Sequence, residues 1–262
     1  MRKKSMKELI RDNRGSEVLS SLIIAATILI ITIISASVAT WMIGIQAAKA
    51  EYEAAKESMI ELADIIEEVG SKMYSSSYVK FNCRYGGLDF LKNSTRIKVM
   101  LETSAENITL IDTHTSGLRY RSRTSFPVTE EYVRGEEVSI VVGEASPVVS
   151  IYTELDENGY PTIWLRGESI RLVEAGTRYL ESRGYNVTVY QLIFFRMTIG
   201  ATFGSGSLNI RVYGKPFSVD SYLSEAAEKI HLIVDGTEAD WVQVDSRCLI
   251  YVVLATVEVA TV

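Results

Sequence analysis

Residues 18–48 read VLSSLIIAATILIITIISASVATWMIGIQAA, and this stretch decides the fold because its 31 residues include no Asp, Glu, Lys or Arg. As an α-helix the stretch would be about 45 Å long, and its most apolar part, residues 18–45, is long enough to cross a bilayer with some tilt. No other charge-free run in the sequence approaches the roughly 20 residues that a membrane span needs. We therefore expect a single membrane-spanning helix, and neither a polytopic membrane protein nor an ordinary cytosolic globular protein.

The charges on the two sides of the apolar stretch predict its orientation. Residues 1–15 carry six basic and two acidic side chains, a net charge of +4, so the net charge of −6 for the whole chain leaves −10 on residues 16–262. The positive-inside rule then places the N-terminus in the cytoplasm and residues 49–262 outside. The apolar core is longer than the roughly 7–15 residues of a cleaved secretory signal, so we expect the helix to be retained. The acidic outer part argues against nucleic-acid binding.

The helix is expected to continue beyond the membrane as an amphipathic segment. Apolar side chains recur at alternating spacings of three and four residues, which is typical of a helix with one buried face. They are Ile45, Ala48, Tyr52, Ala55, Met59, Leu62, Ile66, Val69 and Met73. Gly70 and the run Ser75–Ser77 indicate where the helix ends. The sequence thus predicts one long helix over residues 16–75, hydrophobic over 18–45 and amphipathic beyond.

Residues 76–262 read as a series of short strands separated by polar turns, which is typical of an antiparallel, β-rich domain. The spacing favours a sandwich-like arrangement, so the predicted fold class is α+β: a long N-terminal helix and a C-terminal β-rich head. Asn158-Gly159 between two apolar runs predicts a hairpin, and the apolar run 248–257 predicts a central buried strand. Residues 177–182 and 221–229 could each form a helical turn or a short helix, and a flexible turn is expected at residues 204–207.

Residues 11–48 resemble the class III signal peptide and N-terminal helix of archaeal type IV pilin-like proteins. In that family a short basic leader ends in Lys/Arg-Gly, and a membrane-embedded prepilin peptidase cuts before the apolar helix. The resemblance implies a cleavable leader over residues 1–15, with Arg14, Gly15 and Ser16 as the processing residues. It further implies an assembly ATPase and a platform membrane protein, which would move the helix from the membrane into a helical filament of identical subunits.

The residues that this resemblance places in the filament core belong to the first turns of the mature helix. They are Glu17, Val18, Leu19, Leu22, Ile23, Ala26, Ile30 and Ile33. Bacterial type IV pilins usually carry Glu at the fifth mature position, where this chain has Ser20, and the nearest acidic residue is Glu17. Glu17 could pair with the Ser16 ammonium group of a neighbouring subunit, or it could lie at the membrane surface and favour the helix N-terminus.

The function implied by this resemblance is that of a structural subunit of an extracellular, pilus-like filament. The precursor would lie in the cytoplasmic membrane with its head outside, and the mature form would lie on the cell surface. The alternative with the same helix and head is a single-pass, membrane-anchored surface binding protein or adhesin that never polymerises. Cleavage after Gly15 distinguishes the two, because only the filament subunit needs it.

Two cysteines and three sequons add candidate covalent features to the outer part. Cys83 and Cys248 could form one long-range disulfide outside the cell, or they could be two buried free thiols. No other Cys or His lies near either cysteine in the sequence, which argues against a metal site. The three Asn-x-Ser/Thr sequons make their asparagines glycosylation candidates, the alternative being unmodified strand residues; these are Asn93, Asn107 and Asn186.

The sequence offers little that indicates catalysis. His114 and His231 are the only histidines, and neither lies in a motif for nucleophilic catalysis. Two pairs of adjacent glutamates between residues 130 and 137 match no calcium-loop spacing and indicate a solvated face. We therefore expect no enzyme activity, no cofactor and no metal. One strand face carries alternating basic residues, which could meet a neighbouring subunit or keep a strand edge soluble: Arg119, Arg121 and Arg123.

Overall fold

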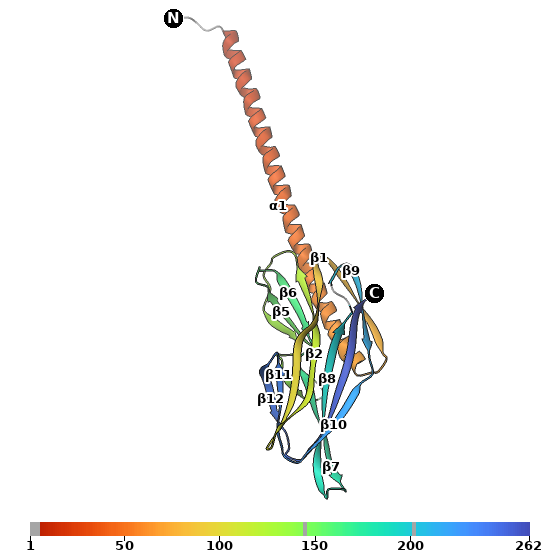
Figure 1. Ribbon diagram of the computed structural model, residues 1–262. Helices are drawn as coiled ribbons and strands as arrows, with labels where there is room; N and C mark the ends of the chain where they lie inside the picture. The colour runs from red at the N-terminus through yellow and green to blue at the C-terminus, as the bar shows by residue number, and fades with distance from the viewer. Residues whose placement is uncertain (1–5, 144–145, 201–202) are drawn as a thin grey trace. The chain divides into compact units, whose positions relative to one another are not determined.

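The computed structural model (Figure 1) describes the backbone of residues 6–143, 146–200 and 203–262; it describes side chains from residue 18 onward in these ranges, except that of Phe203. The chain divides into two compact units, Met1–Ala47 and Ala48–Val262. The helix α1, Met6–Gly70, contributes residues to both units. It therefore begins ten residues before Ser16, where the mature helix is expected to start.

Thirteen strands follow α1 and form one hydrogen-bonded sheet in the described part of the chain. They are β1 (Ser76–Thr103), β2 (Asn107–Ser122), β3 (Glu131–Arg134), β4 (Ile140–Val142), β5 (Ser150–Leu155), β6 (Pro161–Arg166), β7 (Ile170–Leu180), β8 (Tyr185–Ile199), β9 (Phe203–Gly214), β10 (Ser218–Ser224), β11 (Ala227–Val234), β12 (Thr237–Gln243) and β13 (Cys248–Thr261). The sheet order is β3-β5-β6-β2-β1-β9-β13-β8-β7-β4, with β10 joined to β13, β11 joined to β1, and β12 joined to β11. These elements confirm the predicted α+β class.

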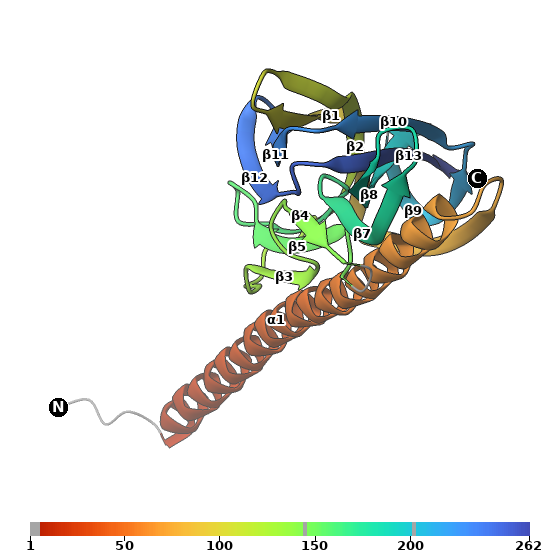
Figure 2. The same ribbon diagram turned by 90° about the horizontal axis from the view of Figure 1, so that it is seen from below.

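Most strand pairs are antiparallel, as predicted, but β13 pairs with β8 in parallel, and so does β4 with β7. The main core cluster joins strands that lie far apart in the sheet order, with Ile140 of β4, Leu192 of β8, Ile97 of β1 and Ile230 of β11 among its members. Their contact requires the sheet to curl around a common core. Figure 2 shows β10 to β13 on one side of this unit and β3 to β5 on the other. A sandwich-like arrangement stays a prediction, because the strands belong to a single sheet.

The second unit contains the last part of α1, residues 48–70, and its buried face confirms the predicted helical spacing. Seven of the predicted positions are at most 4% exposed: Ala48, Tyr52, Ala55, Met59, Leu62, Ile66 and Val69. Met73 is exposed because it lies beyond the end of α1. Burying the larger of these side chains stabilises the unit by roughly 1.5–3 kcal/mol each. The β-rich unit thus includes the amphipathic part of the helix as a component of its own core.

The last residue of α1, Gly70, lies close to β8. A Cβ atom on Gly70 would lie 2.5 Å from Cδ1 of Phe195, so a larger residue would force this ring to move. Tyr74 then adopts a left-handed conformation with φ of 60°. The Ser75 hydroxyl donates to the carbonyl of Lys72 at 2.8 Å, which satisfies a group beyond the last helical turn. The chain therefore enters β1 at Ser76.

Three predictions of local structure are wrong. Residues 177–182, interpreted as a helical turn or a short helix, continue β7 as far as Leu180 and then turn. Residues 221–229, also expected as a helix, form parts of β10 and β11. Residues 204–207, expected as a flexible turn, belong to β9 and lie opposite β1. Residues 177–180 pair with β8 in a hairpin, whereas the other two segments pair with strands distant in sequence, and in each case strand pairing overrides local propensity.

Two other local predictions are confirmed. The Asn158-Gly159 dipeptide joins β5 to β6, with Gly159 at φ of 76° and the Asp156 N–H donating to the Tyr160 carbonyl at 2.9 Å. The run 248–257 lies in β13, which pairs with β8 along one edge and with β9 and β10 along the other. The side chains of β13 alternate between buried and half-buried, as a central strand requires.

Candidate functional site

The apolar part of α1 exposes its side chains on all sides within the first unit. Its large hydrophobic residues between 18 and 43 are 45–66% exposed. Among the described residues, this is the one helix that is long and apolar enough to cross a membrane. A helix that is apolar all round requires lipid or other apolar helices as its surroundings. The candidate site is therefore a surface along a helix, and its chemistry is the exclusion of water.

Five hydroxyl groups on this apolar segment are satisfied within the helix itself. Thr27, Thr32 and Thr40 donate to the carbonyl oxygen four residues earlier at 2.8–2.9 Å. Ser37 makes the same bond at 2.9 Å, and Ser21 donates to the Val18 carbonyl at 3.0 Å. In hydrocarbon an unpaired polar group costs several kcal/mol, so this internal pairing makes the hydroxyls compatible with a dry environment.

The structure places the expected filament-core and processing residues on the same helix. The core residues whose side chains are described are all exposed: Val18, Leu19, Leu22, Ile23, Ala26, Ile30 and Ile33. The backbone of Arg14, Gly15, Ser16 and Glu17 is helical, and their side chains lie outside the described part. The geometry of processing and the two interpretations of Glu17 thus stay predictions.

Glu51 fastens the amphipathic part of α1 to β1 and β2. Its carboxylate accepts hydrogen bonds from the backbone N–H groups of Arg84 and Tyr85, both at 2.8 Å. It also accepts the hydroxyl of Tyr120 at 2.9 Å. Burial and this hydrogen bond both raise the pKa of Tyr120. Burial likewise raises the pKa of Tyr52, whose ring meets that of Tyr120 edge-on at a centroid distance of 6.2 Å.

Glu67, nearer the C-terminal end of α1, makes a second attachment to the sheet. One carboxylate oxygen accepts from Arg134 Nη2 at 2.8 Å and from the N–H groups of Val148 and Val149, each at 3.0 Å. The other oxygen accepts from Arg171 Nη2 at 3.2 Å. The three charged side chains are only 15–17% exposed. Largely buried charged side chains are costly to leave unpaired. Glu67 therefore holds the helix against β3, β7 and the residues just before β5.

Sequence reasoning missed both attachments. Glu51 precedes Tyr52 and Glu67 follows Ile66, and both neighbours belong to the buried apolar series. This closeness to the buried face was the one sign in the sequence that the two glutamates contact the sheet. It could not identify their partners, which lie 33 to 104 residues away along the chain. Asp64 adds to the second attachment through an ion pair with Arg134.

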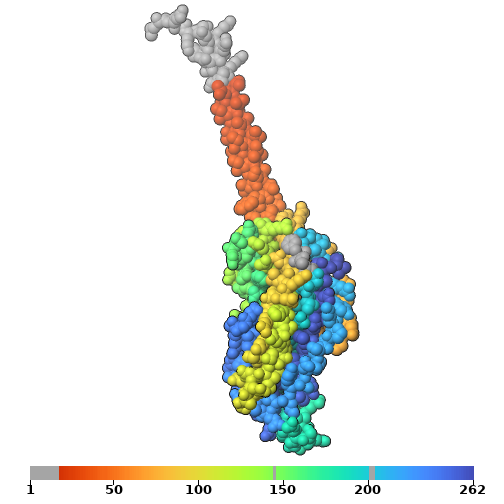
Figure 3. Space-filling view, in the orientation of Figure 1, coloured from red at the N-terminus to blue at the C-terminus, as the bar shows by residue number. Residues whose placement is uncertain are grey.

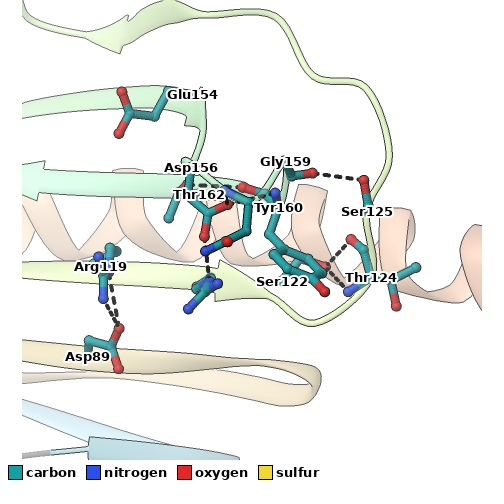
Figure 4. A network of polar contacts seen from close by, with 12 residues as sticks. Asp89, Arg119, Ser122, Thr124, Ser125, Glu154, Asp156, Gly159, Tyr160 and Thr162 are labelled. Atoms are coloured by element: carbon teal, nitrogen blue, oxygen red, sulfur yellow. Dashed lines mark hydrogen bonds and ion pairs between the residues drawn. The ribbon is translucent and has the colours of Figure 1, made fainter.

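Two of the alternating arginines on β2 are paired within the chain. Figure 4 shows Arg119 beside Asp89 of β1, and Nη2 lies 2.7 Å from the carboxylate oxygen. Arg121 Nε lies 2.7 Å from the carboxylate of Asp156, next to the β5–β6 hairpin. The hairpin is held further by the Ser125 hydroxyl, which donates to the Gly159 carbonyl at 2.8 Å (Figure 4). These contacts fix the outer face of the sheet and occupy the two guanidinium groups.

The disulfide expected between Cys83 and Cys248 is wrong, because both cysteines are free and buried. Cys83 lies on β1 opposite Gly206, whereas Cys248 is the first residue of β13. The far end of β13, at Thr261, pairs with Ile210 of β9, which lies close to Gly206 on the same strand. The whole length of β13, roughly 45 Å at 3.3 Å per residue, therefore separates Cys248 from Cys83 along the sheet. A disulfide requires Cα atoms within about 7 Å.

We expect both thiols to resist alkylation in the folded protein. Burial raises the pKa of the Cys83 thiol to about 12 and that of the Cys248 thiol to about 11. The reactive thiolate is therefore scarce up to about pH 10. Iodoacetamide treatment at pH 8, followed by mass spectrometry, should label neither residue in the folded chain and both after denaturation without a reductant. A denatured chain that accepts label only after reduction would contradict this prediction.

The three sequon asparagines lie on the surface of the second unit. Asn93 is exposed and adopts a left-handed conformation with φ of 46°. Asn107 begins β2 after the β1–β2 turn, and Asn186 follows the β7–β8 turn; both are exposed. All three side chains are thus accessible to a glycan, and their modification stays a prediction.

The two histidines lie at different places on the sheet. His231 Nε2 lies 2.9 Å from Glu102, and Nδ1 lies 3.3 Å from Glu238, in a row across β1, β11 and β12. His114 is exposed on β2. No group of three or more His, Cys, Asp or Glu side chains within the described ranges has the arrangement of a metal site.

The fold and site together define an α+β protein with an exposed apolar helix and a β-rich unit that covers the continuation of that helix. No family model, curated protein or solved structure matches this chain. Its function must therefore be argued from its own residues.

Proposed function

We propose that this chain is a structural subunit of a type IV pilus-like filament, made as a membrane precursor with its β-rich head outside the cell. The observation that carries the proposal is the contrast between two parts of α1. The chain buries the apolar face of residues 48–69 in its own core, whereas residues 18–43 are exposed on every side. The first part therefore requires lipid before assembly and neighbouring helices afterwards.

Cleavage between Gly15 and Ser16 would free the helix to leave the membrane. It removes six basic side chains, which hold the precursor N-terminus at the cytoplasmic surface. The assembly ATPase and platform membrane protein would then move the helix into the filament. Exchanging lipid for helix contacts costs little, since both surroundings are apolar, and small side chains allow helices to approach closely. Such residues recur along the helix: Ala25, Ala26, Ser35, Ala36, Ser37 and Gly44.

In this proposal the sandwich-like head is the outer surface of the filament. The exposed asparagines Asn93, Asn107 and Asn186 would carry glycans there. Adhesion would then depend on the head, while polymerisation depends on the helix. The net charge of −10 on residues 16–262 would keep the mature filament surface acidic and soluble.

We expect the protein from native membranes, or from the sheared surface fraction, to begin at Ser16. Gly15→Leu should block processing and leave the chain heavier by the mass of the leader, about 1.8 kDa. Gly44→Leu makes the same replacement on the same helix, where an added Cβ meets no atom within 4 Å, and should leave processing intact. Intact mass spectrometry of the three proteins checks this. A wild-type protein that retains residues 1–15 would overturn the proposal.

A cavity on the β-rich unit favours the second candidate function, an anchored surface binding protein or adhesin that never polymerises. The cavity has a volume of about 620 Å³, and Tyr132, Trp164, Arg166 and Glu168 contribute to its lining. This volume lies within the range of small-molecule sites, and the lining is mostly polar and charged with two aromatic side chains, as a polar ligand would require. In that case the leader would remain on the mature protein, and no filaments would appear at the cell surface.

A further inference from the structure

We propose that one face of β1, β2 and β6, called the outer face below, binds a neutral oligosaccharide chain. Two cavities open on this face: the cavity of about 620 Å³ described above, called the larger cavity, and one of about 320 Å³, called the smaller cavity. The inference rests on the second candidate function, an adhesin, and names the class of its ligand. All residues of the site belong to the unit Ala48–Val262, so the inference applies to a filament subunit as well.

The strand register places both cavities on the outer face. Alternate residues of β1 point to the same side of the sheet, and Gly87 lines the smaller cavity whereas Leu91 lines the larger one. Leu91 lies opposite Gly117 of β2, which lies opposite Arg166 of β6, so no side chain rises between Leu91 and Arg166. Figure 3 shows the green surface of β5 and β6 beside the yellow surface of β1 and β2. Because Gly87 and Leu91 are roughly 13 Å apart along β1, a ligand that fills both cavities is a chain and not a single ring.

A row of three side chains in contact joins the two cavities. Asp89 lines the smaller cavity, Trp164 lines the larger one, and Arg119 lies between them in the strand register. The Arg119 guanidinium is 2.7 Å from the Asp89 carboxylate (Figure 4) and 5.1 Å from the centroid of the Trp164 ring. The Trp164 indole N–H donates to the Glu154 carboxylate at 2.7 Å. These contacts hold the row in place before a ligand arrives, so binding costs little side-chain freedom.

Aromatic rings supply apolar surface to both cavities. Trp164 and Tyr132 line the larger cavity, and Tyr160 lines the smaller one. Tyr132 is 42% exposed, and its ring is held against that of Tyr152 at a centroid distance of 4.8 Å. The C–H groups on one side of a sugar ring form an apolar face that packs on an aromatic ring, while the hydroxyls at its edge stay free for polar partners. The outer face offers such rings at both ends.

The paired charges of the outer face favour a ligand that is polar but neutral. Arg119 is neutralised by Asp89, and Arg121 Nε lies 2.7 Å from the carboxylate of Asp156. A carboxylate can only accept hydrogen bonds and a guanidinium can only donate them, whereas a sugar hydroxyl does both. A chain of sugar units therefore satisfies both kinds of group along the face without adding a charge that lacks a partner.

The lining of the larger cavity disfavours anionic ligands. Among its described lining residues one is basic, Arg166, and four are acidic. The acidic residues are Glu137, Glu168, Asp235 and Glu238. A ligand that carries phosphate, sulfate or carboxylate groups would meet this excess of negative charge and bind less well. Nucleic acids and acidic polysaccharides are thereby disfavoured relative to neutral chains.

A glycan array, probed with the full chain in a neutral detergent without a sugar headgroup, tests the proposal. The array carries linear neutral glucose, galactose and mannose chains, from disaccharides to hexasaccharides, beside sulfated and uronic-acid chains. We expect binding to at least one neutral series and weaker binding to the acidic chains. Affinity should rise with chain length, because only a longer chain reaches the smaller cavity. An array on which no neutral chain binds would overturn the inference.

Isothermal titration calorimetry with the best neutral hexasaccharide then locates the site. Trp164→Ala should weaken binding about fivefold or more, because it removes the central ring of the outer face. Trp241→Ala is the matched control and should bind like the wild type: Trp241 is 49% exposed and lies 4.3 Å from Lys229, outside both linings. Tyr160→Ala should weaken binding of the hexasaccharide and leave that of the disaccharide unchanged.

Trp164→Phe separates a loss of binding from a loss of folding. It keeps a ring but gives up the hydrogen bond to Glu154, so it should retain most of the affinity that Trp164→Ala loses. Equal affinity of Trp164→Ala and the wild type would exclude the outer face as the site. Spermidine that binds more tightly than every neutral chain would indicate a cation site instead. None of these results depends on cleavage after Gly15, so the inference and the filament proposal can fail separately.

Discussion

Leu22→Asp is expected to abolish filament assembly. Leu22 is 66% exposed on the apolar part of α1, so in a membrane its side chain would face hydrocarbon. An Asp costs about 3 kcal/mol at the centre of a spanning helix and less toward its end, where Leu22 lies. In a filament core the same carboxylate would be buried without a partner in every subunit, at a cost of several kcal/mol each. Electron microscopy of cells and immunoblotting of the sheared fraction should show no filaments.

Two further variants make this result specific to the helix surface. Val219→Asp introduces the same charge at a residue of β10 that is 58% exposed, and it should leave filament number unchanged. Ala26→Leu keeps the helix apolar, so it should insert normally but hold neighbouring helices apart and reduce assembly. Membrane extraction at alkaline pH would confirm insertion. If the Leu22→Asp variant and the Ala26→Leu variant each formed filaments at the wild-type level, the anchored, non-polymerising protein would be the better model.

Glu67→Gln is expected to destabilise the β-rich unit by about 2–4 kcal/mol. The change leaves the largely buried Arg134 and Arg171 without their common counter-ion. It also weakens the acceptor for the N–H groups of Val148 and Val149. For a unit of this size the loss corresponds to a fall of roughly 5–15 °C in the unfolding midpoint. Near-ultraviolet circular dichroism of the full chain in neutral detergent measures this midpoint.

The adjacent residue supplies the matched control for Glu67. Glu68 is exposed and pairs with the exposed Lys72 at 2.6 Å, an interaction that solvent screens. Glu68→Gln should therefore leave the midpoint almost unchanged, although it removes the same charge from the same turn of α1. Equal midpoints for the two variants would mean that the ion pairs of Glu67 do not hold the helix to the sheet.

The parts of this fold that the sequence predicted are those whose pattern is local. The apolar series from Ala48 to Val69 follows helical spacing, and its burial needs only that one face meets the sheet. The Asn158-Gly159 hairpin depends on four consecutive residues. By contrast, residues 221–229 read SYLSEAAEK, which favours a helix locally, yet β10 and β11 form because β13 and β1 supply hydrogen bonds. Tertiary pairing decided what propensity could not.

The candidate site divides in the same way. The apolar helix was predicted from its charge-free run of residues 18–48, which is a local pattern. The attachments at Glu51 and Glu67 could not be predicted, because each depends on backbone or arginine groups that only the sheet register brings to the helix. The error over Cys83 and Cys248 has the same origin: separation along the sheet is set by strand pairing, which spacing in the sequence does not reveal.

The central position of β13 has a consequence for how the protein is made. β13 is the last strand in chain order, and it fills the place between β8 on one edge and β9 and β10 on the other. During synthesis those three strands exist before their common partner, with their edges unpaired. Contacts of this sequence separation form slowly, and open edges invite aggregation. The β-rich unit therefore completes its core only after residues 248–261 emerge, and in the proposed precursor this would favour export of an unfolded chain that folds outside the cell.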